Sequence, residues 1–269
     1  EGDAYVLLPF KENDPEKTEF LIQRFQDPGP IQSQLMGLDV VAFHLVAEVA
    51  EGWVKTRQDA ECWYSRSLAA LQGGDLNDDL EEVMEKLTQA GIMKIDGDNL
   101  AVTMLGKVSS WLYYSPFDIS DWCSNFRRLA DAQRLYQDAP VAWALGNVRT
   151  SFSGTYLPQD CTYRMHKLID QLKTANILGS VAPMTLVCDS ILQGYRLESM
   201  NHAWWQFRSD GDRIIQALTL IDKTVIGKIG ADYFEILGMR IKYGCSWTEA
   251  ELCKLPGVGQ VRARALVES

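Results

Sequence analysis

Residues 252–266 read LCKLPGVGQVRARAL, two short helical segments joined by a tight turn that contains glycine. Upstream, Thr248 and Glu251 have the spacing of a capping box, which predicts the start of the first helix. The turn at 255–259 then leads into the second helix. We therefore expect residues 247–269 to form a helix-hairpin-helix.

The two glycines of this turn decide what the hairpin can bind. Gly257 and Gly259 permit positive φ and carry no Cβ atom, so N–H groups at the start of the second helix can point at a phosphate oxygen. Such a contact reads no base edge, so we expect binding to a nucleic-acid backbone and no catalytic residue. A hairpin that merely connects two helices is the alternative. The candidate contacts are Gly257, Val258, Gly259, Gln260, Arg262 and Arg264.

Charge is distributed unevenly along the chain. The 269 residues have a formal net charge of −10, which by itself argues against binding to phosphates. Residues 1–115, however, carry 9 basic and 20 acidic side chains, whereas residues 201–269 carry 9 and 8. The acidity thus lies far from the hairpin, which can approach phosphates with modest, salt-sensitive affinity.

The first part of the chain predicts a single strand. Residues 4–8 (AYVLL) are apolar and β-prone, and Pro9 closes the run. Because one strand needs a partner, we expect the chain to begin at the edge of a sheet that belongs to a missing domain. We interpret residues 1–39 as the end of that sheet and a connector.

Residues 40–117 have the order of a winged-helix domain. Three helical stretches precede two short strands, and Thr56 and Asp59 form a capping box before the second helix. The third helix is expected over 77–90, and the turn at 96–99 joins the strands. A third helix of this kind can enter a DNA major groove, but phosphates would repel its acidic side, so we expect a structural role. The acidic residues are Asp78, Asp79, Glu81, Glu82 and Glu85.

Residues 118–246 are predicted to form a helical bundle, which makes the fold class mainly α. Breaks are expected at Pro140, Gly154–Pro158, Gly179–Pro183 and Gly211. The helix that starts at Asp212 has the clearest periodicity, with a stripe expected to be buried at Ile214, Leu218, Ile221 and Val225. Its opposite side carries Arg213, Gln216, Leu220 and Lys223. A solvated polar face is the ordinary interpretation of such a side.

Cysteines, histidines and hydropathy exclude several classes of protein. The six cysteines and three histidines are scattered, without a CxxC pair or metal-ligand spacing, so we expect reduced thiols and no metal. No apolar run approaches the roughly 20 residues that span a bilayer, and the amino terminus lacks a signal-peptide layout. These features predict a soluble protein with no membrane partner, cytoplasmic or, in a eukaryote, nuclear.

Four segments carry a resemblance to a known family: residues 2–8 (GDAYVLL), Phe43-His44, Thr103-x-Leu105-Gly106 and residues 257–266 (GVGQVRARAL). Together with the order of the predicted domains, they resemble the carboxy-terminal half of the ratchet-domain helicases of superfamily 2. The resemblance is best to the archaeal HelQ-like repair helicases and more distant to the Ski-type and spliceosomal RNA helicases. It implies that residues 1–39 end the second RecA-like domain and that residues 118–246 form the ratchet domain.

The resemblance also implies how a single strand is held. In that family an arginine and an aromatic residue two turns further on contact the strand, and here these positions fall on Arg213 and Leu220. Leucine offers no stacking face, so we expect a weaker grip, or a ring supplied by another residue. The candidates for that ring are Trp204, Trp205 and Phe207, which a hydrophobic core would use equally well.

The chain lacks the motifs of a motor. It contains no GxxxxGK[ST] loop, Asp-Glu metal box or arginine finger. We therefore expect no cofactor here, with ATP and Mg²⁺ bound by RecA-like motor domains absent from this chain. The leading hypothesis is an accessory region of an ATP-dependent DNA helicase that binds single-stranded or forked DNA. Two alternatives remain open: a stand-alone adaptor for nucleic acid or protein, and the same region of an RNA helicase.

Overall fold

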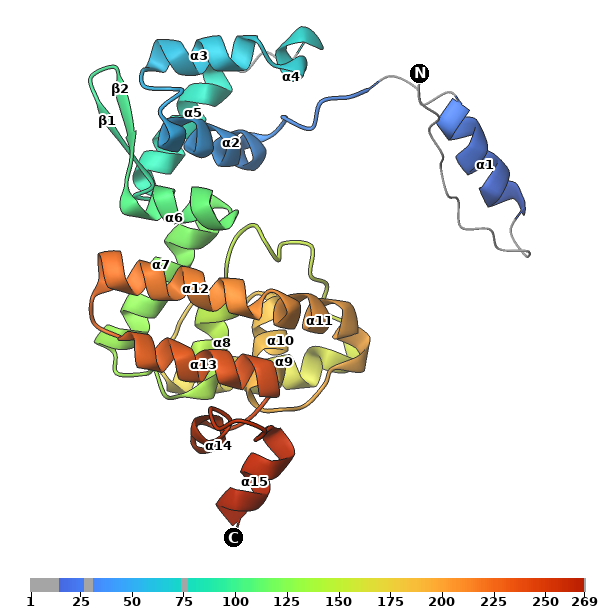
Figure 1. Ribbon diagram of the computed structural model, residues 1–269, viewed down its shortest axis with the longest axis vertical. Helices are drawn as coiled ribbons and strands as arrows, with labels where there is room; N and C mark the ends of the chain where they lie inside the picture. The colour runs from blue at the N-terminus through green and yellow to red at the C-terminus, as the bar shows by residue number, and fades with distance from the viewer. Residues whose placement is uncertain (1–14, 27–30, 74–76, 269) are drawn as a thin grey trace.

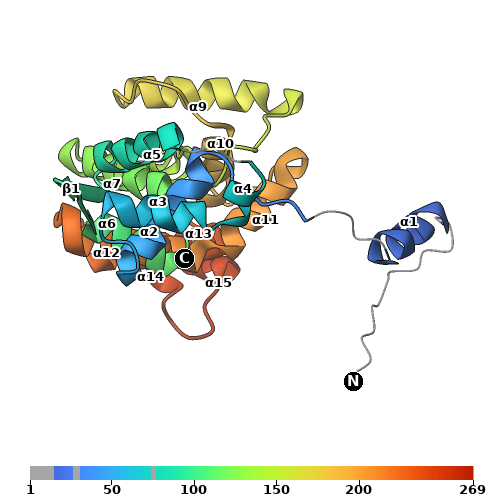
Figure 2. The same ribbon diagram turned by 90° about the horizontal axis from the view of Figure 1, so that it is seen from above.

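The computed structural model describes residues 15–26, 31–73 and 77–268. Over these residues the protein is mainly α-helical and has one two-stranded sheet (Figures 1 and 2), which confirms the predicted fold class. The strand predicted at residues 4–8 lies outside the described residues. Helix α1 (Pro15–Gln26) stands apart from the other helices in both views.

The first folded unit has the helix and strand order of a winged helix. Its elements are α2 (Leu38–Glu51), α3 (Arg57–Ser65), the one-turn α4 (Leu68–Leu71), α5 (Asn77–Gln89), β1 (Met93–Asp96) and β2 (Asn99–Val102). The strands pair antiparallel, with Asp96 opposite Asn99 at the turn. Helix α6 (Met104–Leu112) follows.

Local sequence signals set the ends of these helices. The hydroxyl of Thr56 accepts the N–H of Asp59 at 3.1 Å, and the carboxylate of Asp59 accepts the N–H of Thr56 at 3.0 Å. The capping box predicted there is therefore confirmed. Helix α5 ends where Gly91 adopts a φ of 69°, a left-handed conformation that costs little only in glycine.

The second unit is a bundle of helices. It contains α7 (Pro116–Asp131), α8 (Asp138–Gly146), α9 (Thr162–Thr174), α10 (Pro183–Leu192), α11 (Asn201–Ser209), α12 (Gly211–Ile221) and α13 (Ala231–Tyr243), with a π-helical turn at Asp222–Ile226 and 3₁₀ turns at Gln159–Cys161 and Glu198–Met200. The predicted breaks at 154–158 and 179–183 fall in the loops before α9 and α10. The break predicted at Pro140 is wrong, because Pro140 lies in the first turn of α8, where a missing N–H costs nothing.

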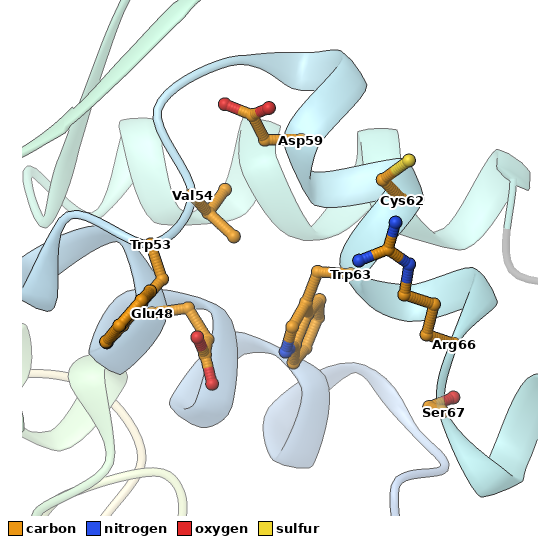
Figure 3. Close-up of a pocket in the computed structure, with 8 residues that line it drawn as sticks. All are labelled: Glu48, Trp53, Val54, Asp59, Cys62, Trp63, Arg66 and Ser67. Carbon is orange, nitrogen blue, oxygen red and sulfur yellow. The ribbon is translucent and has the colours of Figure 1, made fainter.

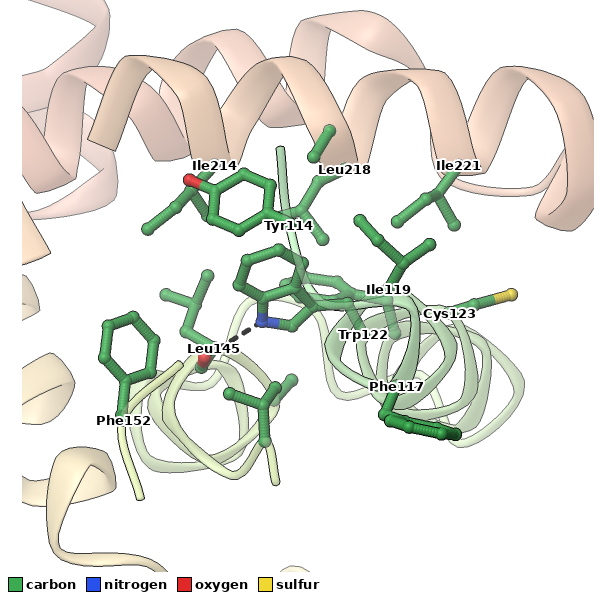
Figure 4. Packing of buried hydrophobic residues seen from close by; sticks show 14 of the residues in the cluster. Tyr114, Phe117, Ile119, Trp122, Cys123, Leu145, Phe152, Ile214, Leu218 and Ile221 are labelled. Carbon is green, nitrogen blue, oxygen red and sulfur yellow. Dashed lines mark hydrogen bonds between the residues drawn. The ribbon is translucent and has the colours of Figure 1, made fainter. Parts of the chain in front are cut away.

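Helix α12 packs on the core through the stripe that its periodicity predicts. Ile214, Leu218 and Ile221 are fully buried and face the side chains of α7, while Val225, in the π-helical turn, is half-buried (Figure 4). Beneath them the indole Nε1 of Trp122 donates to the carbonyl of Leu145 at 3.0 Å, which satisfies the one polar atom of that buried ring. The core therefore fixes which side of α12 faces solvent.

The last two helices, α14 (Trp247–Leu252) and α15 (Gln260–Glu268), pack on a small core of their own. The capping box predicted at Thr248 and Glu251 is wrong by two residues, because Ser246 caps α14 and pairs with Glu249. The hydroxyl of Ser246 accepts the N–H of Glu249 at 3.2 Å, and the carboxylate of Glu249 accepts the N–H of Ser246 at 2.7 Å.

Candidate nucleic-acid interface

The exposed side of α12 and of the π-helical turn after it presents three of the four residues predicted to face a strand. Arg213, Gln216 and, in the turn, Lys223 are exposed, whereas Leu220 is half-buried and packs against the hydrophobic core. Leu220 therefore serves mainly as a core residue at the edge of this face. The exposed side chains of α12 include the acidic Asp212 beside Arg213 and Gln216.

The side chain of Arg213 is held by several contacts within the protein that its sequence position does not indicate. Its Nε and Nη2 donate to the carboxylate of Asp210 at 2.8 and 3.0 Å, and its Nη1 donates to the carbonyl of Leu112 at 3.3 Å. The guanidinium also lies 4.4 Å from the ring centroid of Tyr114. Arg213 thus ties α12 to the end of α6, while its side chain stays 44% exposed. The hydrogen bond to Asp210 raises the pKa of Arg213, so it stays charged.

The three aromatic residues of α11 divide into two kinds. Trp204 and Phe207 are buried and belong to the hydrophobic core, so neither offers a ring to a ligand. Trp205 is 53% exposed. Of the three residues that the sequence leaves as candidates for a stacking ring, only Trp205 has an accessible face.

The hairpin between α14 and α15 has one left-handed glycine. Gly257 has a φ of 78° and so uses the conformational freedom of glycine, whereas Gly259 does not have a positive φ. A Cβ atom on Gly259 would still have nothing within 4 Å, so the space beside the start of α15 is open. The first hydrogen bond of α15 joins the N–H of Ala263 to the carbonyl of Gly259 at 2.9 Å. Earlier N–H groups of the helix have no acceptor within it and can bind an anion.

The polar side chains of the hairpin also bind within the protein. Arg262 donates to the carbonyl of Gly257 at 2.6 Å, and Arg264 pairs with Glu249 at 3.1 Å. The Gln260 amide donates to the carbonyl of Gly244 at 2.6 Å, which fixes the start of α15 against the end of α13. Val258 is half-buried and packs on the small core of α14 and α15. These contacts hold the turn rigid and leave both arginine side chains largely exposed.

The winged-helix unit presents a different surface. The exposed carboxylates of α5 include Glu81, paired with Arg57, and Glu82, paired with Lys86 at 2.8 Å. Such a surface repels phosphates. On another side, a pocket of about 560 Å³ lies between α2 and α3, where Trp53 and Trp63 stand near Glu48 and Arg66 (Figure 3). Trp53 is 79% exposed.

The described residues were compared with the requirements of a metal site, a disulfide and a membrane-spanning helix. No group of three His, Cys, Asp or Glu side chains comes together there to hold a metal ion. All six cysteines are free thiols, and only Cys62 is exposed. None of the described helices is long and apolar enough to span a membrane.

Comparison with known proteins points to helicases. No protein-family model matches the chain. The chain is 27% identical over 252 residues to the ATP-dependent DNA helicase Hel308 of Thermoplasma acidophilum, an alignment that covers 90% of this chain and 36% of that protein. The corresponding values are 28% identity, 90% and 20% for Hel308 of Methanocaldococcus jannaschii, and 24%, 91% and 36% for Hel308 of Thermoplasma volcanium. The chain thus spans about a third or less of the curated relatives that it matches.

Two features of the candidate interface could not be predicted from the sequence. Tyr114 meets Asp210 and Arg213 across about a hundred residues of chain, a separation that no local pattern reports. The accessible Trp205 has a weak local signal, since Arg196 and Arg208 flank the Trp204-Trp205 pair. Only the packing of α11 reveals which of the two indoles faces solvent.

Proposed function

We propose that the chain is the nucleic-acid-binding accessory region of an ATP-dependent superfamily 2 DNA helicase, in which it holds the translocated single strand. The observation that carries the proposal is the hairpin, where open space at Gly259 adjoins the unpaired N–H groups at the start of α15. Similarity to three DNA helicases along nine-tenths of the chain supports the same assignment. We place this region in the carboxy-terminal part of the parent protein.

The strand has two proposed contacts with the chain. The exposed face of α12 binds it through Arg213, Gln216 and Lys223, with Leu220 at the edge. The hairpin binds the phosphate backbone farther along, through the N–H groups near Gly257, Gly259 and Gln260 and the charges of Arg262 and Arg264. The N–H of Val258 instead donates to the carbonyl of Leu255 at 3.1 Å and holds the turn. Neither contact reads a base edge, so binding is independent of base sequence.

Each structural unit has its own role in the proposed function. Residues 40–117 form a winged helix with a structural role, residues 118–246 a ratchet domain and residues 247–269 the helix-hairpin-helix. Residues 1–39 connect to a RecA-like motor, which binds ATP and Mg²⁺ and supplies the force. The whole protein acts inside the cell, and its substrate is forked or single-stranded DNA.

Binding of a labelled oligothymidylate by the isolated chain tests the proposal. We expect affinity that falls with salt, with a logarithmic slope of about −0.7 for each phosphate contacted. Absence of binding at low salt contradicts the proposal. Competition with an oligouridylate of equal length decides between DNA and RNA, because only RNA carries a 2′-hydroxyl.

An adaptor function has one specific observation in its favour. Trp53 is the more exposed of the two indoles at the pocket of Figure 3, and an exposed tryptophan of this kind is frequent where proteins meet. If the chain works as an adaptor that binds only protein, it binds no oligonucleotide at low salt and Trp53→Ala abolishes binding to its protein partner. The helicase proposal predicts that Trp53→Ala leaves DNA binding unchanged.

A further inference from the structure

Trp205 presents a large aromatic face that the hydrophobic core does not use. It lies on α11 between Trp204, which is buried, and Phe207, which is fully buried. The Trp204 ring meets the Trp205 ring edge to face, with centroids 5.0 Å apart and planes at 83°. This contact supports Trp205 from below and leaves part of its ring open to solvent.

Two arginines flank this ring. The guanidinium of Arg196 lies 5.6 Å from the Trp205 ring centroid, and that of Arg208 lies 6.0 Å from it. Arg196 donates to the side chain of Asn201 at 2.8 Å, so its position is fixed. Arg208 donates to the carbonyls of Ile241, at 3.1 Å, and Lys242, at the end of α13.

The cations of this patch keep donors for a ligand. A guanidinium has five N–H donors, and the bonds of Arg208 to α13 use two of its nitrogens. Arg196 also pairs with the exposed Glu198 at 3.5 Å, a surface ion pair that is worth little in water. Arg208 lies closer to the buried Trp204 ring, at 4.5 Å from its centroid. The patch is therefore an accessible ring with two cations close by, which is the chemistry that binds a base and its adjacent phosphates.

Trp205 lies on the helix directly before α12 in the chain. Asp210, between α11 and α12, keeps right-handed helical angles, and hydrogen bonds join its N–H to Gln206 at 3.2 Å and its carbonyl to Ile214 at 3.0 Å. The single residue Asp210 thus joins α11 to α12, which remain separate helices. Trp205 and Gln216 are eleven residues apart in the chain, and both are exposed.

A row of contacts leads from Trp205 to the hairpin. Arg208, beside the Trp205 ring, donates to the carbonyl of Lys242. Two residues further along, the carbonyl of Gly244 accepts the amide of Gln260, the first residue of α15. Through Arg208 and the end of α13, the aromatic patch is thus connected to the base of the hairpin, and α12 follows α11 directly in the chain.

We propose that Trp205 is a stacking platform for one base of the single strand, with Arg196 and Arg208 binding the phosphates beside that base. The inference rests on the proposed function, because it places a third contact along the same strand. It adds a stacking contribution that neither the half-buried Leu220 nor the hairpin N–H groups can supply. Stacking depends on a π-face and tolerates any base.

The test compares Trp205→Ala with Trp205→Phe and with Trp53→Ala in the full 269-residue chain. Trp53 is also an exposed tryptophan, but it lies on the winged-helix unit, so it is the matched control. We expect Trp205→Ala to weaken binding to oligothymidylate about 5- to 100-fold, the range that base–aromatic stacking supplies. Trp205→Phe retains most of the affinity and Trp53→Ala retains all of it.

Two further readouts separate stacking from a structural effect. An oligonucleotide that contains iododeoxyuridine cross-links under light to a ring stacked on that base, and mass spectrometry should identify Trp205 as the cross-linked residue. Trp205→Ala should leave the salt slope unchanged, since it removes no charge, whereas Arg196→Gln should reduce the salt slope.

The outcomes distinguish this inference from the proposed function. If the unaltered chain binds oligothymidylate and Trp205→Ala binds equally well without a cross-link at Trp205, the stacking platform is overturned and the hairpin and α12 contacts stand. If the unaltered chain does not bind, both proposals fail together. A loss of affinity in Trp205→Ala with rescue by Trp205→Phe supports the platform.

Discussion

The guanidinium of Arg213 lies 4.4 Å from the ring centroid of Tyr114, and both side chains bind the same carboxylate, that of Asp210. Tyr114 follows α6 at the end of the winged-helix unit, whereas Arg213 lies in the first turn of α12. One set of polar contacts therefore joins the winged helix to the helix proposed to carry the strand. Burial and the hydrogen bond to Asp210 raise the pKa of the Tyr114 hydroxyl, so it remains a donor.

Arg213→Ala should lower stability as well as DNA binding. The variant loses an ion pair with Asp210 and a cation–π contact with Tyr114, each worth up to about 1 kcal/mol at a partly exposed site. We expect the melting temperature to fall by about 2–4 °C for each kcal/mol lost. Differential scanning calorimetry measures the change.

Lys223→Ala is the matched control for that variant. Lys223 is also a cation on the exposed side, and the structure shows it in no ion pair with another described residue. Its loss should weaken oligonucleotide binding without moving the melting temperature. If Arg213→Ala and Lys223→Ala prove equally stable, the contacts of Arg213 with Asp210 and Tyr114 contribute nothing to folding.

The two glycines of the hairpin should respond differently to alanine. Gly257 has a φ of 78°, where a side chain costs roughly 1–2 kcal/mol, so Gly257→Ala should lower stability and binding together. Gly259→Ala meets no neighbour within 4 Å, so the fold should tolerate it. Its new methyl group, however, occupies space beside the N–H groups that start α15, and we expect weaker binding at an unchanged melting temperature. Equal affinity for Gly259→Ala and the unaltered chain argues against a phosphate at this position.

The sequence predicts the parts of the fold that local patterns encode. The stripe on α12, the wing and the caps at Thr56 and Gly91 follow from periodicity and spacing. The cap of α14 shows the limit, because Ser246 and Glu249 satisfy the same pattern as Thr248 and Glu251. Tertiary contacts decide which of these two pairs caps α14, since Glu249 also pairs with Arg264 from α15.

The candidate site is less predictable because its side chains are shared with the fold. Arg213 and Gln260 were selected from the sequence as ligand contacts, and both also bind groups of the protein. Which of Trp204 and Trp205 is accessible depends on how α11 packs, which no local pattern states. Residue type and spacing therefore propose candidate contacts on α12 and the hairpin, while tertiary packing determines which of their atoms remain open.

Stability should decrease as pH rises from about 4 to 6 because of Asp189. Burial raises the pKa of Asp189 to about 6, although hydrogen bonds from Gln193 and Tyr195 oppose that rise. The unfolded chain ionises Asp189 near pH 4, so between these values the folded state holds a proton that the unfolded state has lost. The stabilising effect is thus complete below about pH 4 and lost above about pH 6, on the order of 3 kcal/mol.

Asp189→Asn isolates this effect. The amide oxygen can still accept from Gln193, which donates to Asp189 at 2.7 Å, and the side chain no longer titrates. Urea unfolding between pH 4 and 8 should show a smaller loss of stability in the variant than in the unaltered chain. If the free energy of unfolding falls equally with pH in the variant and in the unaltered chain, Asp189 is not the source of the decrease.

Arg240 should be the most sensitive residue at the base of the hairpin. Its side chain is 1% exposed and donates to Asp138 at 2.7 Å and to the carbonyls of Cys245 and Leu192 at 2.8 Å. Asp138 is 35% exposed, so the main cost of removing Arg240 comes from the carbonyls of Cys245 and Leu192, which lose their donor at about 1–3 kcal/mol for each buried group. Arg240→Leu should therefore lower the free energy of unfolding by about that amount for each carbonyl.

The same substitution should also reduce DNA binding through the hairpin. The carbonyl of Cys245 lies just before α14, and the Arg240 guanidinium stacks 4.6 Å from the ring centroid of Trp247, the first residue of that helix. Without Arg240 the hairpin loses its fixed orientation relative to α13, so affinity falls even at temperatures where the chain remains folded. Lys173→Ala, which breaks the exposed pair with Asp170 on α9, serves as the control and should cost no more than about 1 kcal/mol without changing affinity. Urea midpoints and oligonucleotide anisotropy measure both effects, and an Arg240→Leu chain as stable as Lys173→Ala would show that the contacts of Arg240 do not hold the hairpin.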